Sequence, residues 1–273
     1  MRNVAAGGCR EIGCNDTREF DVSVYRKTIA VWFSCGAASA VAAKLTLDKY
    51  GADNRVLILN NPVAEEDYDN RRFADDVAKW IGSPIITVTN SQFPDARCVD
   101  VWNDRRFMSG PLGAPCTVLL KKHARHQWEN DNHTDWHVLG FTVDEVKRHE
   151  RFTMSERDNV LPVLIDAGLT KQDCVDVLLR AGIEPPRVYA LGFPNANCIG
   201  CVKASSPTYW NLVRRTFPDA FWERAMLSRS IGARLVRVNG ERIFLDELDP
   251  SVVGRPLSSM NVECGTFCEE AIT

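Results

Sequence analysis

The chain has 273 residues, 45% of them hydrophobic and 25% charged, a composition typical of a soluble globular protein with a sizeable core. Its 33 lysines and arginines against 36 aspartates and glutamates give a formal charge of −3. This balance excludes a protein held on nucleic acid by bulk charge alone, although a local basic patch is compatible with it. No stretch reaches the about 18 apolar residues of a membrane span, and residues 1–20 lack the apolar core of a signal peptide. We therefore expect a cytoplasmic protein without a membrane partner.

Ten cysteines stand out in such a chain. A reducing cytosol does not favour disulfides, and a chain of this length does not need them to fold. We expect some of these cysteines to bind metal or to act chemically. Others, Cys98 and Cys174 among them, are expected to be small buried hydrophobic residues.

The first half of the chain alternates short apolar runs with amphipathic stretches. The expected strands are 29–33, 55–60, 85–88 and 137–141, and the expected helices are 37–50, 66–81 and 116–128. Strands that alternate with helices predict right-handed βαβ units. We therefore expect an α/β fold of HUP or Rossmann-like type, a mostly parallel sheet with helices on both faces.

The second half has a different pattern. Thr170 and Asp173 form a plausible capping box for a helix that ends at Gly182. A cysteine-rich loop at 195–201, helices at 209–217 and 219–230 and a short strand at 242–245 are expected after it. The simplest division is an N-terminal arm (1–27), an α/β domain (28–192) and a helical, cysteine-bearing C-terminal extension (193–273) packed on that domain.

The loop after the first strand, Ser34-Cys35-Gly36-Ala37-Ala38-Ser39, lies where a parallel sheet binds its ligands. Its small residues allow close approach of an anion to the backbone N–H groups that begin the next helix. The hydroxyls of Ser34 and Ser39 are further donors to phosphate oxygens. The Rossmann glycine pattern and the Walker A lysine are both absent. A phosphate-binding loop and a tight βα turn chosen for packing are both compatible with this pattern.

The motif Ser34-x-Gly36-x-x-Ser39 after a hydrophobic strand resembles the PP-loop of the adenine nucleotide alpha hydrolase superfamily. From about residue 28 to residue 268 the chain resembles the phosphoadenosine phosphosulfate (PAPS) reductase family, in the subgroup often carried by bacteriophages. The resemblance implies that the loop, with Ser34, Cys35, Gly36, Ala37 and Ser39, binds the phosphate or sulfate end of ATP or of an adenylylated sulfate. Many ATP-splitting members carry an acidic residue where this chain has Ala38, which favours the reductase-like branch.

Two further segments at strand ends resemble this family. Asn60 ends the second strand, where the family contacts adenine or ribose. The stretch from Gly140 through Glu145 to Arg148 resembles the family's Gly-x-x-x-x-Glu-x-x-Arg segment. Glycine allows close approach of a nucleotide, and arginine binds phosphate or sulfate through two hydrogen bonds. Glu145 and Arg148 are therefore candidate catalytic residues, with a solvated helix start as the alternative.

A cationic stretch follows Cys116. Lys121, Lys122 and Arg125 form either a helix surface that faces an anion or a solvated charge run. His123 and His126 lie in the same stretch, as metal ligands or, more commonly for such histidines, as surface residues.

Cys198-Ile199-Gly200-Cys201 has the spacing with which two thiolates bind one metal centre. Cys116 lies 82 residues earlier, at a loop-to-helix boundary. This resembles adenylylsulfate reductases, where a cysteine pair lies about this far ahead of a C-x-x-C motif and the four cysteines hold a [4Fe–4S] cluster. Here the pair is reduced to Cys116, which leaves the fourth ligand open.

The tail, Glu263-Cys264-Gly265-Thr266-Phe267-Cys268, resembles the C-terminal Glu-Cys-Gly-(Ile/Leu)-His of sulfonucleotide reductases. The resemblance implies that Cys264 is the nucleophile that attacks sulfur. Phe267 replaces the family's histidine, and Cys268 is an additional thiol.

Several metal sites are compatible with these cysteines. The first is an iron–sulfur cluster on Cys116, Cys198, Cys201 and a tail cysteine such as Cys268. The second is a zinc site on Cys198, Cys201, Cys264 and Cys268 that attaches the tail to the body. A cluster with three protein ligands and one open iron, or no metal at all, are the remaining alternatives.

Three functions follow from these motifs. A PAPS reductase-like enzyme would use a thiol reductant and release sulfite. An ATP-dependent sulfur transferase or nucleic-acid-modifying enzyme would adenylate tRNA or DNA and take sulfur from a donor. A nucleotide-binding module would bind without turnover. A homodimer is compatible with each.

Overall fold

The computed structural model describes residues 27–110 and 113–257. Its centre is a five-stranded parallel sheet with the strand order β3-β2-β1-β4-β5. The strands are β1 (Thr28–Trp32), β2 (Arg55–Asn60), β3 (Ile85–Thr87), β4 (Trp136–Val138) and β5 (Val160–Leu161). The predicted parallel sheet is confirmed, with the additional short strand β5 at its edge.

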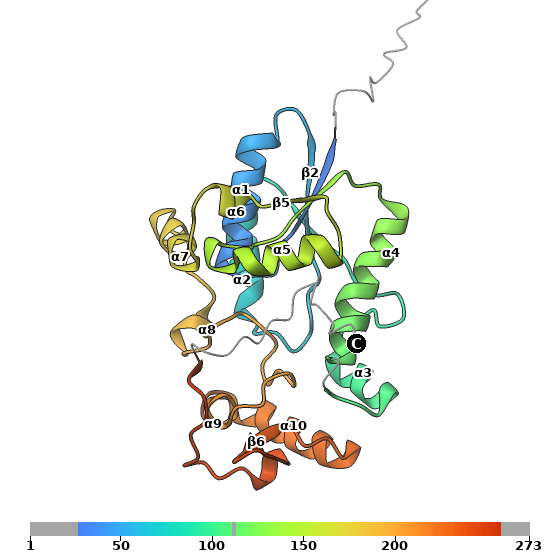
Figure 1. Ribbon diagram of the computed structural model, residues 1–273, viewed down its shortest axis with the longest axis vertical. Helices are drawn as coiled ribbons and strands as arrows, with labels where there is room; N and C mark the ends of the chain where they lie inside the picture. Colours follow the sequence, from blue (N-terminus) through green and yellow to red (C-terminus); the bar gives the residue numbers. More distant parts are fainter. Residues whose placement is uncertain (1–26, 111–112, 258–273) are drawn as a thin grey trace, which may run out of the picture.

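Helices cover both faces of this sheet (Figure 1). One face carries α1 (Ala37–Tyr50), α2 (Asp69–Ile81), α6 (Val163–Asp166) and α7 (Lys171–Arg180), and the other carries α4 (Ala124–Asp131) and α5 (Val146–Ser155). Ala40 and Ala43 have no exposed surface, because small side chains allow α1 to pack closely on the strands.

Helix α2 begins three residues later than its amphipathic pattern predicts. The carboxylate of Asp67 accepts hydrogen bonds from the backbone N–H of Asp69 (2.9 Å) and from the guanidinium of Arg187 (2.8 Å). These bonds hold residues 66–68 in a turn, so the helix starts at Asp69.

The C-terminal part forms a second layer, which Figure 1 shows at the end of the molecule away from α1. It contains α8 (Arg187–Ala190), α9 (Pro207–Thr216), α10 (Pro218–Ile231), β6 (Val236–Val238), β7 (Glu241–Ile243) and a 3₁₀ turn (Leu245–Glu247). The strand expected over 242–245 is wrong in extent: β7 pairs with β6 in a separate hairpin, and Leu245 already begins the 3₁₀ turn. Asn239 and Gly240 both have positive φ, as the two-residue hairpin turn requires.

Two elements differ from the sequence-based expectation between β3 and β4. The helix α3 (Cys98–Arg105) was not expected. The helix expected over 116–128 consists of a π-helical segment (Thr117–His123) followed by α4. A π-helical segment widens the helical turn and is frequent at functional sites.

A hydrophobic cluster joins α3 and the π-helical segment to α9 and α10, and it includes Trp102, Trp210 and Phe221. The C-terminal extension therefore packs on this part of the chain. Within the described ranges, no helix is long and apolar enough to cross a membrane.

We predict that Trp210→Ala destabilises the protein by about 3–5 kcal/mol, because the side chain is fully buried and its removal leaves a large cavity. Trp222→Ala on the same layer is the matched control, since Trp222 is 50% exposed and its loss should cost about 0.5 kcal/mol or less. Denaturant unfolding followed by circular dichroism measures both. Equal destabilisation by the two variants would contradict the packing described above.

Candidate functional site

The loop between β1 and α1 lies where the strand order reverses. β1 and β4 are neighbours in the sheet, and their following elements run to opposite sides of it. Ligands of open α/β sheets bind in the crevice at such a point. Gly140, which follows β4, packs directly on the loop: a Cβ atom there would lie 2.9 Å from the backbone nitrogen of Ser39. The two predicted binding segments are therefore in contact.

Ser39 holds the shape of this loop. Its Oγ accepts hydrogen bonds from the backbone N–H of Ser34 (3.1 Å) and of Gly36 (3.4 Å) and donates to the carbonyl of Gly36 (2.9 Å). Ser39 is buried, whereas Ser34 is exposed. The backbone N–H of Ala37 lies 3.4 Å from the hydroxyl of Tyr189 and donates to it. Ser39 therefore shapes the loop, and Ser34 is the hydroxyl that a ligand can reach.

Cys35 anchors the loop to the end of β2. The residue is buried in the left-handed region (φ 55), and the Nδ2 of Asn60 donates to its Sγ at 3.0 Å. Burial raises the pKa of the Cys35 thiol to about 12. The thiol is therefore neutral at physiological pH, and it fixes the loop rather than acting as a nucleophile.

A buried ion pair lies beside Cys35. The Nζ of Lys121 lies 3.3 Å from the Oε1 of Glu66, and both side chains are about nine-tenths buried. Burial raises the pKa of Glu66. Arg125 is 1% exposed, and burial lowers its pKa to about 10. Lys121 and Arg125 are thus interior residues, so the cationic stretch is neither a solvated charge run nor a free anion-facing surface.

The two candidate catalytic residues after Gly140 contact each other. The Oε2 of Glu145 accepts from the backbone N–H of Thr142 (3.3 Å), which caps the turn before α5. The Nη1 of Arg148 donates to the Oε1 of Glu145 at 2.6 Å. These contacts place both residues at the start of α5, next to the Gly140 segment, and their catalytic roles stay predictions. His123 and His126 are both exposed, in the arrangement expected of surface residues.

Four buried cysteines gather on the other side of the β2 end. Cys98 at the start of α3, Cys116, Cys198 and Cys201 all belong to the cluster that joins the two layers. The thiol of Cys98 hydrogen-bonds to those of Cys116 and Cys198, which raises the pKa of Cys98 well above its usual value. The same contact with Cys98 lowers the pKa of Cys116. The two thiols therefore share one hydrogen-bonded contact, in which Cys98 donates and Cys116 accepts.

The structure places Cys116 and Cys198 of the C-x-x-C motif in contact with Cys98, which was not among the predicted site residues. Cys98 is buried as expected, but its neighbours are thiols rather than hydrocarbon side chains. No short cysteine spacing in the sequence indicates it. Cys174 packs in the α1 cluster, where burial raises its pKa to about 12. The predicted ligand Cys268 and the predicted nucleophile Cys264 lie outside the described residues.

The surroundings of the four thiols test whether a metal group fits. In the described residues no three His, Cys, Asp or Glu side chains are arranged to hold a metal ion as they stand. The indole of Trp102 hydrogen-bonds to the thiol of Cys116. Four buried thiols are the donor set that an iron–sulfur cluster takes, and metal binding by them stays a prediction.

The loop after β2 connects the two sites. The carboxylate of Glu65 accepts from the backbone N–H of Cys98 (2.8 Å) and of Val99 (3.1 Å). The carbonyl of Glu65 accepts from the backbone N–H of Ile199 inside the C-x-x-C motif (2.8 Å). Glu66, the next residue, reaches Lys121. One short segment thus touches the cysteine site on one side and the surroundings of Cys35 on the other.

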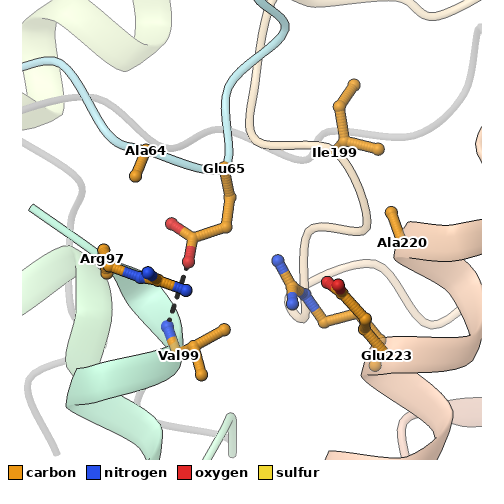
Figure 2. Close-up of a pocket in the computed structure, with 8 residues that line it drawn as sticks. Ala64, Glu65, Arg97, Val99, Ile199, Ala220 and Glu223 are labelled. Carbon is orange, nitrogen blue, oxygen red and sulfur yellow. Dashed lines mark hydrogen bonds between the residues drawn. The ribbon is translucent and has the colours of Figure 1, made fainter.

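A surface pocket of about 380 Å³ opens next to this connection. Figure 2 shows Glu65 with Arg97 and Val99 on one wall, and Ala220 and Glu223 of α10 on the opposite wall. Because Ile199 also lines the pocket, solvent reaches the outer side of the C-x-x-C loop there.

The described residues define a Rossmann-like α/β protein whose first βα loop is made of small residues and is held in shape by Ser39. No protein-family model matches the chain, and no curated protein does. This chain has a low similarity to one solved structure, that of the U34-tRNA thiolase NcsA from Methanococcus maripaludis with its [4Fe-4S] cluster. It is 13% identical, with 90% of this chain and 81% of that chain covered and a TM-score of 0.45.

We predict that Gly140→Ala weakens adenine nucleotide binding about tenfold or more, which is ~1.4 kcal/mol. The added Cβ would meet backbone atoms of Ala38 and Ser39 that cannot move without distorting the loop. Titration calorimetry with ATP measures the effect. Gly82→Ala at the end of α2 is the control for backbone strain away from the loop, because its Cβ meets nothing within 4 Å but its φ of 65° is unfavourable for alanine. Unchanged affinity in Gly140→Ala would show that the loop is not the nucleotide site.

We predict that Cys98→Ser lowers the iron and sulfide content of anaerobically purified protein as strongly as Cys116→Ser does, because both thiols belong to one site. Cys174→Ser is the matched control, a buried cysteine in the α1 cluster. Iron and acid-labile sulfide assays measure the content. Full loading of Cys98→Ser, with loss in Cys268→Ser, would assign the fourth ligand to the tail instead.

Proposed function

We propose that this chain is an adenine-nucleotide-dependent sulfur transferase with a four-cysteine iron–sulfur centre. The observation that supports the proposal is the loop 61–68, which touches both the surroundings of the PP-loop and the cysteine site. A nucleotide site and a sulfur-binding site on one strand end suit a reaction in which activation and sulfur chemistry occur together.

In this proposal the Ser34–Ser39 loop binds the phosphates of ATP. Ser34 and the N-terminal amides of α1 donate to the phosphate oxygens. A carbonyl oxygen of the acceptor attacks the α-phosphorus, and pyrophosphate leaves. Sulfide then adds to the activated carbon, and AMP departs with the original oxygen. The roles of Gly140 and Asn60 are to let the nucleotide approach and to hold its nucleoside end.

The centre held by the cysteines would supply a sulfur-binding or electron-transferring group. Cys98, Cys116, Cys198 and Cys201 are the residues that would hold it. Their burial beside Trp102 and Tyr209 excludes bulk water from the thiols.

The acceptor class we propose is a nucleic acid base, with phosphates contacted by local cations. Lys121 and Arg125 are buried and do not serve this purpose. Lys147 and Arg151 are exposed on α5, the helix that follows the Gly140 segment. Arg215 on α9 is also exposed.

A second candidate is reduction of an adenylylated sulfate such as PAPS. Its specific support is the Glu263-Cys264-Gly265 segment, where Cys264 would attack sulfur, and Ala38 in place of an acidic residue. In that case a thiol reductant releases the sulfur as sulfite.

We predict that the protein releases pyrophosphate from ATP only when a nucleic acid acceptor, tRNA or DNA, is present, and AMP only when sulfide is present as well. Chromatography of the nucleotides and mass spectrometry of the acceptor detect the products. Ser34→Ala should slow the reaction about tenfold or more, since a hydrogen bond to a charged group contributes about 1.5–3 kcal/mol. Ser155→Ala, an exposed serine at the end of α5, is the control.

The same preparation separates the two candidates. If the protein releases sulfite from PAPS and a thiol, and Cys264→Ser abolishes this release, the function is sulfate reduction rather than sulfur transfer. Tight ATP binding without any product under either condition would identify a nucleotide-binding module.

A further inference from the structure

The C-terminal layer is positively charged, although the whole chain has a formal charge of −3. Residues 193–257 contain nine lysines and arginines against six aspartates and glutamates. Three of these arginines, Arg234, Arg237 and Arg242, lie in the β6–β7 hairpin or two residues before it, and all three are exposed. We call them the hairpin arginines. They form a local basic surface that the net charge does not reveal.

Two of the hairpin arginines face each other across the hairpin. Arg237 of β6 lies directly opposite Arg242 of β7. The next pair in the register, Val236 and Ile243, packs in the hydrophobic cluster with α9 and α10, so the alternation of strand side chains places both arginines on the outer face. Opposite residues of an antiparallel pair have Cβ atoms about 4.5–5.5 Å apart, and like charges there are destabilising. This pairing therefore costs stability unless an anion lies between the two guanidinium groups.

The hairpin arginines have no carboxylate partner in the part of the chain that the structure describes. Arg229 at the end of α10 is the contrast, because it pairs with Asp246 (2.8 Å) and Glu247 (3.1 Å). The Nη1 of Arg242 donates to the backbone carbonyl of Arg234 at 3.3 Å, which leaves its charge uncompensated. The acids of this turn therefore compensate Arg229, whereas the charge of the hairpin arginines is directed to solvent.

The hairpin is attached to the loop that follows the C-x-x-C motif. The backbone N–H of Arg237 donates to the carbonyl of Ser205 at 2.9 Å, four residues after Cys201. The hydroxyl of Tyr209 on α9 accepts from the backbone N–H of Cys201 at 2.8 Å, so the same loop is also held by that helix. Figure 1 shows β6 with α9 and α10 at the end of the molecule away from α1. A polymer bound to the hairpin is therefore held in a defined position relative to the cysteine site.

We propose that the hairpin arginines bind the phosphate backbone of the nucleic acid acceptor. The inference rests on the acceptor class of the proposed function and assigns its docking surface to the C-terminal layer. Arginine binds a phosphate through two parallel hydrogen bonds, for which its planar group is pre-organised. A phosphate between Arg237 and Arg242 would also remove their mutual repulsion. Contacts of this kind position a nucleic acid without reading its sequence.

The experiment measures the binding of fluorescently labelled tRNA, and of a DNA duplex of similar length, by anisotropy at several salt concentrations. The double variant Arg237→Gln, Arg242→Gln should weaken binding about tenfold and reduce the slope of log affinity against log salt by about 1.5, because each phosphate contact contributes about 0.7–0.9 to that slope. Loss of affinity for either probe supports the inference. The double variant Arg55→Gln, Arg180→Gln is the matched control, since it removes the same charge from two exposed arginines of the α/β domain.

Denaturant unfolding checks the fold of the variants. Because the substitutions remove opposed like charges, the hairpin double variant should be at least as stable as wild type. If it does not fold, Arg237→Gln alone decides, with about half of the change in salt slope expected. Equal loss of binding in the control variant would show a general charge effect and overturn the inference. Wild-type affinity of the hairpin variant for both probes, or a wild-type protein that binds neither probe, would overturn it as well.

Product formation separates this inference from the proposed function. Wild-type protein that binds tRNA through the hairpin, yet releases neither pyrophosphate nor AMP from ATP with tRNA and sulfide, would refute the proposed function and leave the docking surface standing. Wild-type protein that modifies the acceptor, with a hairpin variant that binds it equally well, would refute the docking surface and leave the proposed function standing.

Discussion

The arrangement of both sites depends on the hydrogen bonds of Glu65. Its carboxylate binds the first amides of α3, and its carbonyl binds the amide of Ile199. A carboxylate at a helix N-terminus satisfies amides that have no partner within the helix and is favoured by the helix dipole. Because Glu65 closely follows β2, these bonds bring Cys98 and the C-x-x-C loop to the strand end that also holds the PP-loop through Asn60 and Cys35.

Buried charge is the second organising feature, and the formal charge of −3 does not reveal it. Lys121 pairs with Glu66 under the PP-loop, whereas Arg224 lies against Trp102 beside the cysteines. The first pair is neutral as a unit, which is the usual condition for burying charge. The second cation has no such partner in the described residues.

The first part of the sheet was predictable from periodicity, because strands β1 and β2 and the helices that follow them are long and regular. The PP-loop and the C-x-x-C motif were predictable because their residues are adjacent in sequence. Cys98 was not, since its membership of the site is set by Glu65, 33 residues earlier in the chain. The short helix α3 has few buried residues of its own, and its position depends on tertiary contacts. Arg224 reads in the sequence as one more surface arginine of an amphipathic helix.

The cysteines of the described residues divide by environment. Cys35 fixes the PP-loop, Cys174 packs under α1, and four thiols lie together between the two layers. In the proposed sulfur transferase, Cys98, Cys116, Cys198 and Cys201 would hold the centre. Under that proposal Cys264 would be left as a nucleophile, because a thiol that is not bound to metal keeps its nucleophilicity.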